Sequence, residues 1–342
     1  MRLAIITDTH FGARNENQAI LKSTINFFSD TFFPYLEENN IDTILHLGDL
    51  VDRRKSINFL ILNYLRKYFI NPIVNLDMKA HIVVGNHDMY YKNTNQVNSI
   101  NELYGDNESI FVYDTAEDIV LDDLKVCLVP WICPENESDT FIHLNRTDAQ
   151  VMMGHLELNG FTMHMGMVCE HGYDVQDFQK FDQIFSGHFH HKNGKGNIEY
   201  LGSPYQLTWS DYNTPRGFHI YDTSTRDLEF IENPVQNFVR LEYSELASTD
   251  FDLQDKFVKV IVKRKDNPYH FEKYMEKVNE ANPYVVRIIE ERLEISDTSN
   301  LVDEAQDTLS ILGKYVDELD TDLDKNRLKV LLQELYSESL KI

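Results

Sequence analysis

The sequence predicts an α/β protein in three parts: a layered core of two packed sheets flanked by helices, a small β-α-β cap domain, and C-terminal helices. Two patterns in the 342 residues predict the core. Short apolar runs of strand length alternate with stretches of helical spacing, which is typical of sheets covered by helices. Toward residue 232 the pattern becomes strand-rich, which favours two packed sheets over one.

The core elements follow from apolar spacing and from turn residues. Residues 18–38 have apolar positions at helical intervals, and we expect Pro34 to bend or end this helix. Residues 56–69 predict a second helix. Apolar runs that end at turn residues predict strands, and these runs are residues 2–7, 42–47, 80–84, 124–130, 149–153, 183–186, 198–202, 217–222 and 228–232.

A second unit is expected from about residue 240. Residues 257–263 predict a half-buried strand, residues 269–278 a helix and residues 284–292 another strand. The acidic end of the chain predicts two helices. The last has an apolar stripe within residues 328–340, which suits packing on its own domain or docking on a partner helix. The expected domains are residues 1–240, 241–295 and 296–342.

Composition and charge exclude several classes of protein. A hydrophobic content of 42% with 26% charged residues is globular, so a disordered or low-complexity chain is excluded. The 32 basic and 56 acidic residues give a net charge of −24, which tells against tight nucleic-acid binding without metal. Such a charge suits a site whose positive charge comes from bound cations. No apolar run approaches the ~18 residues of a membrane span, so no membrane association is expected.

Three cysteines and the first residues of the chain bear on the cellular compartment. The cysteines are odd in number and lack the spacing of a zinc knuckle, so we expect reduced thiols. The first apolar stretch is cut short by Asp8, which is not the pattern of a signal peptide. The expected location is therefore the cytoplasm.

Polar clusters follow five of the strand-like runs. Because parallel strands present their carboxyl ends at one edge of a sheet, these clusters are expected to converge on one site. Singly, each cluster is more typical of an ordinary turn, and only the combination indicates a site. The five motifs are Asp8-Thr9-His10, Gly48-Asp49-Leu50-Val51-Asp52, Gly85-Asn86-His87-Asp88, Gly154-His155 and Gly187-His188-Phe189-His190.

The residue types in these motifs predict a metal centre. Asp, Asn and His together suit Mn²⁺, Fe²⁺, Zn²⁺ or Ni²⁺ better than an all-oxygen calcium cage. Seven candidate ligands are too many for one ion, and they fit two ions that share a carboxylate, the arrangement used for in-line phosphoester displacement. His143 and His219 lie outside the motifs and are expected to be hydrogen-bonded structural residues.

In this order and combination the motifs resemble the calcineurin-like metallophosphoesterases. Within that family the chain is similar to the nuclease subunits of SbcC/SbcD-type DNA-repair complexes, and especially to the version of that subunit found in T-even phages. The resemblance implies two divalent ions, with Mn²⁺ expected and Mg²⁺ as the alternative. The implied roles are Asp8, His10 and His190 on the first ion, Asn86, His155 and His188 on the second, Asp49 bridging both, His87 as general acid and Asp88 orienting its ring.

The same resemblance implies a function and partners. It implies a DNA nuclease that acts as an exonuclease on duplex ends and as an endonuclease on single strands, in DNA recombination, repair and replication. The implied partner is an SbcC-type coiled-coil ATPase, bound by residues 296–342. The chain is expected to form a homodimer, with residues 56–69 as the guessed surface, and a phage-encoded chain would act in the host cytoplasm.

Three alternative functions stay open at this point. A phosphatase of the protein-serine/threonine kind shares the centre, but the chain has GDLVDRR and GNHD where that group has GDxVDRG and GNHE. A small-molecule or cyclic-nucleotide phosphodiesterase shares both GNHD and GHxH. A non-catalytic scaffold for the ATPase would predict damaged ligands, and all seven candidate positions carry residues able to bind metal.

Three further segments have two interpretations each. Residues 53–55 are basic and predict either a phosphate contact or the solvated start of a helix. In residues 156–180 core packing by methionines is favoured over contact with metal or substrate. Residues 205–216, with Trp209 and Arg216, predict either a rim that stacks on unpaired bases or an exposed loop.

Overall fold

The computed structural model describes residues 1–164, 167–244, 250–265 and 267–290, together with residues 316, 325 and 327–329. The chain divides into two compact units, Met1–Glu291 and Arg292–Ile342. All elements below belong to the first unit. Apart from those five residues, the expected C-terminal helices and the apolar stripe lie outside the described residues.

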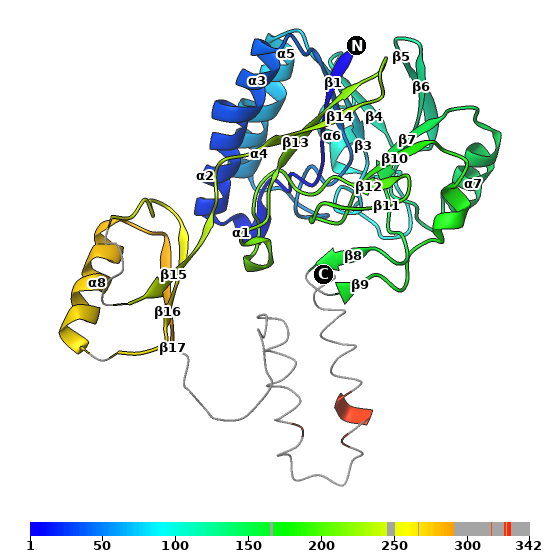
Figure 1. Ribbon diagram of the computed structural model, residues 1–342. Helices are drawn as coiled ribbons and strands as arrows, with labels where there is room; N and C mark the ends of the chain where they lie inside the picture. Colours follow the sequence, from blue (N-terminus) through cyan, green and yellow to red (C-terminus); the bar gives the residue numbers. More distant parts are fainter. Residues whose placement is uncertain are drawn as a thin grey trace. The chain divides into compact units, whose positions relative to one another are not determined.

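The core of the first unit contains two six-stranded sheets (Figure 1). Sheet one has the order β14-β13-β1-β2-β3-β4, and sheet two has the order β11-β12-β10-β7-β6-β5. Sheet one consists of β1 (Arg2–Ile6), β2 (Thr43–His46), β3 (Lys79–Val83), β4 (Ile110–Tyr113), β13 (Gly217–Asp222) and β14 (Leu228–Glu232). Sheet two consists of β5 (Glu117–Leu121), β6 (Leu124–Val129), β7 (Val151–His155), β10 (Gln183–Gly187), β11 (Asn193–Lys195) and β12 (Ile198–Tyr200).

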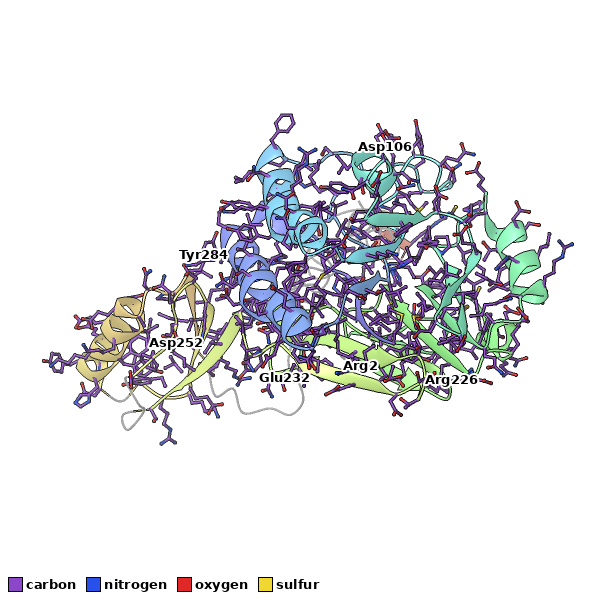
Figure 2. All side chains as sticks on the ribbon, turned by 90° about the horizontal axis from the view of Figure 1, so that it is seen from above. Arg2, Asp106, Arg226, Glu232, Asp252 and Tyr284 are labelled. Carbon is purple, nitrogen blue, oxygen red and sulfur yellow. The ribbon has the colours of Figure 1, made fainter. Side chains whose placement is uncertain are left out.

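Alternate residues of the strands explain why the two sheets pack together. Leu3 and Ile5 of β1 join one apolar cluster with Met153 of β7 and Phe185 of β10. The residues between them point the other way, and Ala4 lies in the cluster that contains the helices. Strands buried on both faces read as continuous apolar runs, which is the pattern from which they were predicted. Seen from above, side chains fill the layers densely, with Arg2 and Glu232 on the side of sheet one (Figure 2).

Two long helical segments cover the outer face of sheet one. The first is α2 (Gln18–Asn26), a π-helix η1 (Phe27–Phe32) and α3 (Phe33–Glu38), and the second is α4 (Phe59–Leu65), a π-helix η2 (Arg66–Ile70) and α5 (Asn71–Asn75). Each π-helix ends just before a proline, Pro34 or Pro72. A proline ring clashes with the carbonyl four residues earlier, and the wider π-turn relieves that clash, so the chain continues helical where we expected a bend.

The remaining helices of the core are short. α1 (Ala13–Glu16) and α6 (Ser99–Tyr104) belong to the side of sheet one, and α7 (Glu137–Arg146) packs on sheet two through Leu144. Two 3-10 turns, η3 (Val175–Phe178) and η4 (Trp209–Asp211), lie in the connecting loops, and β8 (Thr162–His164) pairs with β9 (Met167–Val168). In the part of the chain that the structure describes, no helix is long and apolar enough to cross a membrane.

The cap contains the expected β-α-β module and one further strand. β16 (Phe257–Val262), α8 (Pro268–Glu280) and β17 (Val285–Glu290) form the module, and β15 (Phe238–Tyr243) adds a third parallel strand. Val258 and Val260 of β16 pack against Phe271 and Val278 of α8. β15 begins at Phe238, near residue 240, from which the sequence pattern predicts a second unit.

Candidate metal centre

All five predicted motifs lie where strands end. The loops after β1, β2 and β3 of sheet one meet the ends of β7 and β10 of sheet two. The first two loops run side by side, because the main-chain N–H of Asp8 donates to Gly48 at 3.0 Å and that of His10 donates to Asp49 at 3.0 Å. The expected convergence of the motifs on one site is therefore seen in the structure.

Four of the candidate residues have left-handed backbone conformations. The φ angles are 52° at Asp8, 42° at His10, 56° at Asp49 and 87° at His188. Residues other than glycine adopt positive φ rarely, and such strain concentrates at functional sites. The sharp turns redirect each chain as its strand ends, so that the side chains point into a common space.

Gly48 is required by both conformation and space. Its φ is 92°, and a Cβ atom there would lie 2.5 Å from Nδ1 of His155. Any larger residue would displace a candidate ligand. Gly85 is similarly crowded, because a Cβ there would collide with the main-chain nitrogen of Asp49.

Asp8, His10 and His190 form the first group of donors. Nε2 of His10 lies 3.0 Å from Nε2 of His190, and each of these atoms lies 3.9 Å from Oδ1 of Asp8. Two imidazole nitrogens this close together could bind the same divalent ion. The carboxylate of Asp8 also accepts the main-chain N–H of His188 at 3.1 Å, which fixes its direction.

Asn86, His155 and His188 form the second group. Oδ1 of Asn86 lies 3.0 Å from Nε2 of His155 and 3.0 Å from Nδ1 of His188. Asp49 lies between the two groups, with one oxygen, Oδ2, 3.4 Å from Nε2 of His155 and 3.6 Å from Nε2 of His10. A single carboxylate therefore reaches both groups, as expected of a bridging residue.

His87 lies at the edge of the first group, where its ring meets that of His10 edge to face with centroids 4.8 Å apart. Its Nδ1 is 2.6 Å from the main-chain oxygen of Asp52, so Nδ1–H donates there and Nε2 carries the lone pair. Burial lowers the pKa of His87.

Asp88 is placed differently from the expectation. Its carboxylate does not hold the ring of His87, which the Asp52 carbonyl holds instead. The carboxylate accepts main-chain N–H groups of Asp49 at 2.8 Å, Leu50 at 3.0 Å and Gly85 at 2.9 Å. Asp88 thus ties the second motif to the third. Burial and the charge of Asp49 raise the pKa of this carboxyl to about 7.

The charges of the centre attract cations. Burial alone would lower the pKa of His155, but Asp49, Asp8 and the Leu47 carbonyl together raise the pKa to about 9. The pKa of His10 is likewise raised to about 9 against burial, by Asp52 and Asp49. Burial and neighbouring His10 lower the pKa of His190 to about 4, so the two facing rings cannot both hold a proton. A divalent ion between them fits this field better than protons do.

The donor set fits divalent metal. Three overlapping groups place their ligand atoms within 4.8 Å of one another. They are Asp8-His10-His190, His10-Asp49-His87 and Asp49-His155-His188. A fourth group, Asp118-Cys127-His143, lies apart from the motifs, and there Asp118 already accepts hydrogen bonds from Thr147 at 2.8 and 2.7 Å.

A buried ion pair supports the first group from behind, and the sequence did not reveal it. Arg216 donates to the main-chain oxygen of His190 and, at 2.7 Å, to Asp211. The prediction that residues 205–216 form a base-stacking rim or an exposed loop is wrong for Arg216, which is only 4% exposed. Trp209 packs on Phe238 of the cap at 4.9 Å between ring centroids, and Nζ of Lys259 lies 4.1 Å from the centroid of the Trp209 ring.

The structure also bears on residues 53–55 and 156–180, for which the sequence allowed two interpretations each. Residues 53–55 lie before α4, which begins at Phe59, so they are not the first turn of that helix. Arg53 and Lys55 are exposed, as the solvated interpretation requires, and Arg53 pairs with Glu16 at 3.3 Å. In residues 156–180, Met163 packs partly on the core whereas Met167 is 51% exposed, so core packing explains only part of the segment.

The two lone histidines differ from each other. His143 contacts Asp118 at 3.0 Å, which confirms the structural interpretation. His219 is buried, but its Nε2 has no hydrogen-bond partner among the described residues, contrary to the expectation.

Comparisons with known proteins agree with this geometry. The sequence profile of the calcineurin-like phosphoesterases matches residues 1–192. Exonuclease subunit 1 of Enterobacteria phage T4 is 31% identical over 343 residues, covering 99% of this chain and 99% of the phage protein. The SbcD component of nuclease SbcCD from Staphylococcus epidermidis is 23% identical over 309 residues, covering 79% of this chain and 78% of that protein.

The SbcD component from Staphylococcus saprophyticus is 26% identical over 345 residues, covering 87% of this chain and 85% of that protein. The profile match contains the five motifs, and the family implies divalent metal ions, for which the donor groups described above are available. On the motifs, their convergence and these matches, the chain belongs to the calcineurin-like phosphoesterase family.

Proposed function

We propose that this chain is a metal-dependent DNA nuclease and the nuclease subunit of an SbcC/SbcD-type complex. The observation that carries the proposal is the position of Oδ2 of Asp49, between two groups of nitrogen and oxygen donors. The full-length similarity to an exonuclease subunit of phage T4 supports DNA as the substrate. The activity would be exonucleolytic on duplex ends and endonucleolytic on single strands.

Two divalent ions, with Mn²⁺ preferred and Mg²⁺ as the alternative, would occupy the donor groups. Asp8, His10 and His190 would hold one ion, and Asp49 would be shared. Asn86, His155 and His188 would hold the other, with the Asn86 amide oxygen limiting the negative charge that an approaching phosphate meets. When bound, such a pair of ions polarises the scissile phosphate and activates the attacking water.

His87, in the form that carries a proton on both ring nitrogens, would donate the Nε2 proton to the leaving sugar oxygen and return to the neutral ring. Its Nδ1–H is held by the Asp52 carbonyl, so the second nitrogen, Nε2, is the one available to exchange a proton with substrate. Asp88 would act indirectly, because it fixes the main chain at Asp49 and at Gly85, two residues before His87. The net charge of −24 is compatible with DNA because the bound ions supply the local positive charge.

A homodimer and an ATPase partner complete the proposal. The start of α4 offers an apolar surface, with Phe59 88% and Leu60 45% exposed, within the segment guessed from sequence. We expect Phe59→Asp to convert a dimer to a monomer by light scattering. Val120→Asp is the matched control, because Val120 is 65% exposed on β5. If Phe59→Asp had the same mass as the unaltered protein, this surface would not be the dimer interface.

The function is tested with purified protein in Mn²⁺ and in Mg²⁺, beside His87→Asn. The substrates are end-labelled duplex DNA, circular single-stranded DNA, a cyclic nucleotide and a phosphoprotein. Cleavage of DNA that His87→Asn abolishes would support the nuclease. Turnover of the cyclic nucleotide alone would favour a small-molecule phosphodiesterase, and no turnover with any substrate would favour a scaffold for the ATPase.

A further inference from the structure

A cavity of about 220 Å³ adjoins the second donor group. Trp131 forms the wall between them, with its ring 4.8 Å from that of His188 and 6.0 Å from that of His155. Glu157 borders the same side, with Oε1 3.6 Å from Nε2 of His188. A molecule bound through phosphate at the metal centre would therefore lie beside this cavity.

The lining of the cavity includes both aromatic and aliphatic side chains. Trp131 and Tyr173 provide rings, and the buried residues Ile132 and Leu156 provide apolar surface. Its volume is below the ~300–1,000 Å³ of sites that hold drug-sized ligands, so it suits a single flat ring system. Aromatic walls favour an aromatic occupant, because a stacked ring buries apolar area on both faces.

The walls are fixed before anything binds. The main chain of Trp131 donates to Val84 at 2.8 Å and accepts from Asn95 at 3.0 Å, so its backbone is fixed beside the cavity. The chain before Tyr173 lies against Glu157, because Tyr173 N–H donates to the Glu157 carbonyl at 2.9 Å. A Cβ on Gly172 would lie 2.5 Å from that same carbonyl, so only glycine allows this approach.

The charge of the cavity excludes a phosphate as its occupant. Glu157 contributes a carboxylate, and the hydroxyl of Tyr173 donates to a second one, Glu137, at 3.1 Å. Among the described residues that line the cavity, there is no lysine or arginine. Phosphate groups would be repelled from it toward the cations, whereas an uncharged ring attached to that phosphate would not be.

We propose that this cavity receives the unpaired base of the nucleotide whose phosphate binds at the metal centre, stacked between Trp131 and Tyr173. The inference rests on the proposed function and deepens it, because it makes the single-stranded nucleotide the unit that the site recognises. Stacking on aromatic side chains tolerates every base, so the cavity would bind without sequence preference.

The test compares two competitive inhibitors on the same protein. The substrate is methyl p-nitrophenyl phosphate, which has no base, so its turnover reports the metal centre alone. The two inhibitors, each added in a separate titration, are dAMP and 2-deoxyribose 5-phosphate. Both inhibitors carry the same phosphate and sugar, so any change at the metal centre cancels from the ratio of their inhibition constants. In the unaltered protein we expect dAMP to bind about 10-fold or more tightly than the base-free sugar phosphate.

Three variants locate the effect. Tyr173→Ala is expected to bring the ratio close to one, whereas Tyr173→Phe keeps the ring and should keep the ratio. His171→Ala removes an exposed residue at the rim, carries little risk to folding, and should lower the ratio partly. A ratio near one in the unaltered protein, or one that both alanine variants leave unchanged, would overturn the proposal.

The same experiment separates this inference from the proposed function. Preference for dAMP without cleavage of DNA would support the base cavity and overturn the nuclease. Cleavage of DNA with a ratio near one would support the nuclease and overturn the cavity.

Discussion

The two donor groups of the metal centre are held in different ways. The first half is Asp8, His10 and His190, and the second half is Asn86, His155 and His188. In the second half, Nδ1 of His155 donates directly to the Leu47 carbonyl at 2.7 Å, which leaves Nε2 facing the other donors of its group. In the first half, Nδ1 of His10 lies 3.5 Å from Asp52, which is longer than an ordinary hydrogen bond. His190 is held through its main chain, by the arginine that directly precedes β13.

This difference shows which contacts each half of the metal centre depends on. Direct hydrogen bonds to a histidine ligand fix its tautomer and its orientation. The second half therefore depends on its own loops, whereas the first half also depends on the ion pair of Arg216 and Asp211 in the interior. Distant substitutions should disturb the first half more than the second.

Asp49→Ala should have the largest effect, because it removes the oxygen that both halves share. We expect both ions to be lost or greatly weakened and activity to fall to background. Calorimetric titration with Mn²⁺ measures the number of ions, and DNA cleavage measures activity. Full Mn²⁺-dependent activity in this variant, or in His155→Ala, would show that the metal assignment is wrong.

His87→Asn should leave both halves intact and still block turnover. Loss of a general acid costs about 10²- to 10⁴-fold in rate. The loss should nearly vanish with thymidine 5′-(p-nitrophenyl phosphate), because nitrophenolate leaves without a proton. If His87→Asn lost the same factor in rate on DNA and on the nitrophenyl ester, His87 would not be the proton donor. If the variant no longer bound Mn²⁺, His87 would be a metal ligand instead.

Sequence could predict the centre because its donors come in short motifs at strand ends. Asp8, Asp49 and His155 each follow a buried apolar run, and this local signal requires no knowledge of distant contacts. The layered core was predictable for the same reason. The strands β4 and β5 were missed, although β4 reads IFVY and β5 reads EDIVL.

The supporting contacts could not be predicted in this way. Arg216 meets the carbonyl of His190 only because the start of β13 lies beside the last motif, and a basic residue near an aromatic loop looks like a surface residue in sequence. Asp88 sits beside His87 in the chain, which suggested a contact between their side chains. The turn directs its carboxylate instead to the main chain of the preceding motif.

Arg216→Met should destabilise the fold and weaken the first half selectively. It leaves the buried Asp211 carboxylate without its cation, a loss that costs about 3–5 kcal/mol. Urea unfolding measures the cost, and Mn²⁺ titration should show weakening of the ion that His155→Ala retains. The double variant with Asp211→Asn should recover part of the stability, because no unpaired charge is left buried. Equal weakening of both ions would contradict the comparison of the halves.

The pH dependence of this effect has a defined sign. Burial raises the pKa of Asp211, but the hydrogen bond of His191 and the charge of Arg216 hold the pKa below its ordinary value. A depressed pKa contributes stability above the unfolded value of about 3.9, which is lost as pH falls through the folded pKa. The difference in stability between the unaltered protein and Asp211→Asn, in which residue 211 cannot titrate, should therefore be full at pH 7 and shrink below about pH 4.

Glu157→Gln and Asp52→Asn should give the smallest effects, and they sharpen the comparison most. Glu157 lies 3.6 Å from His188 of the second half, and Asp52 lies 3.5 Å from His10 of the first. Outer contacts of this kind change metal affinity by about 10- to 100-fold when they are hydrogen bonds, and these long contacts should give the lower end or less. Each substitution keeps the size of the side chain and removes its charge, so Mn²⁺ titration should show similar, small losses, each confined to one ion. A much larger loss for Asp52→Asn would mean that its contact with His10 closes to a hydrogen bond when metal binds, and the first half would then be as directly held as the second.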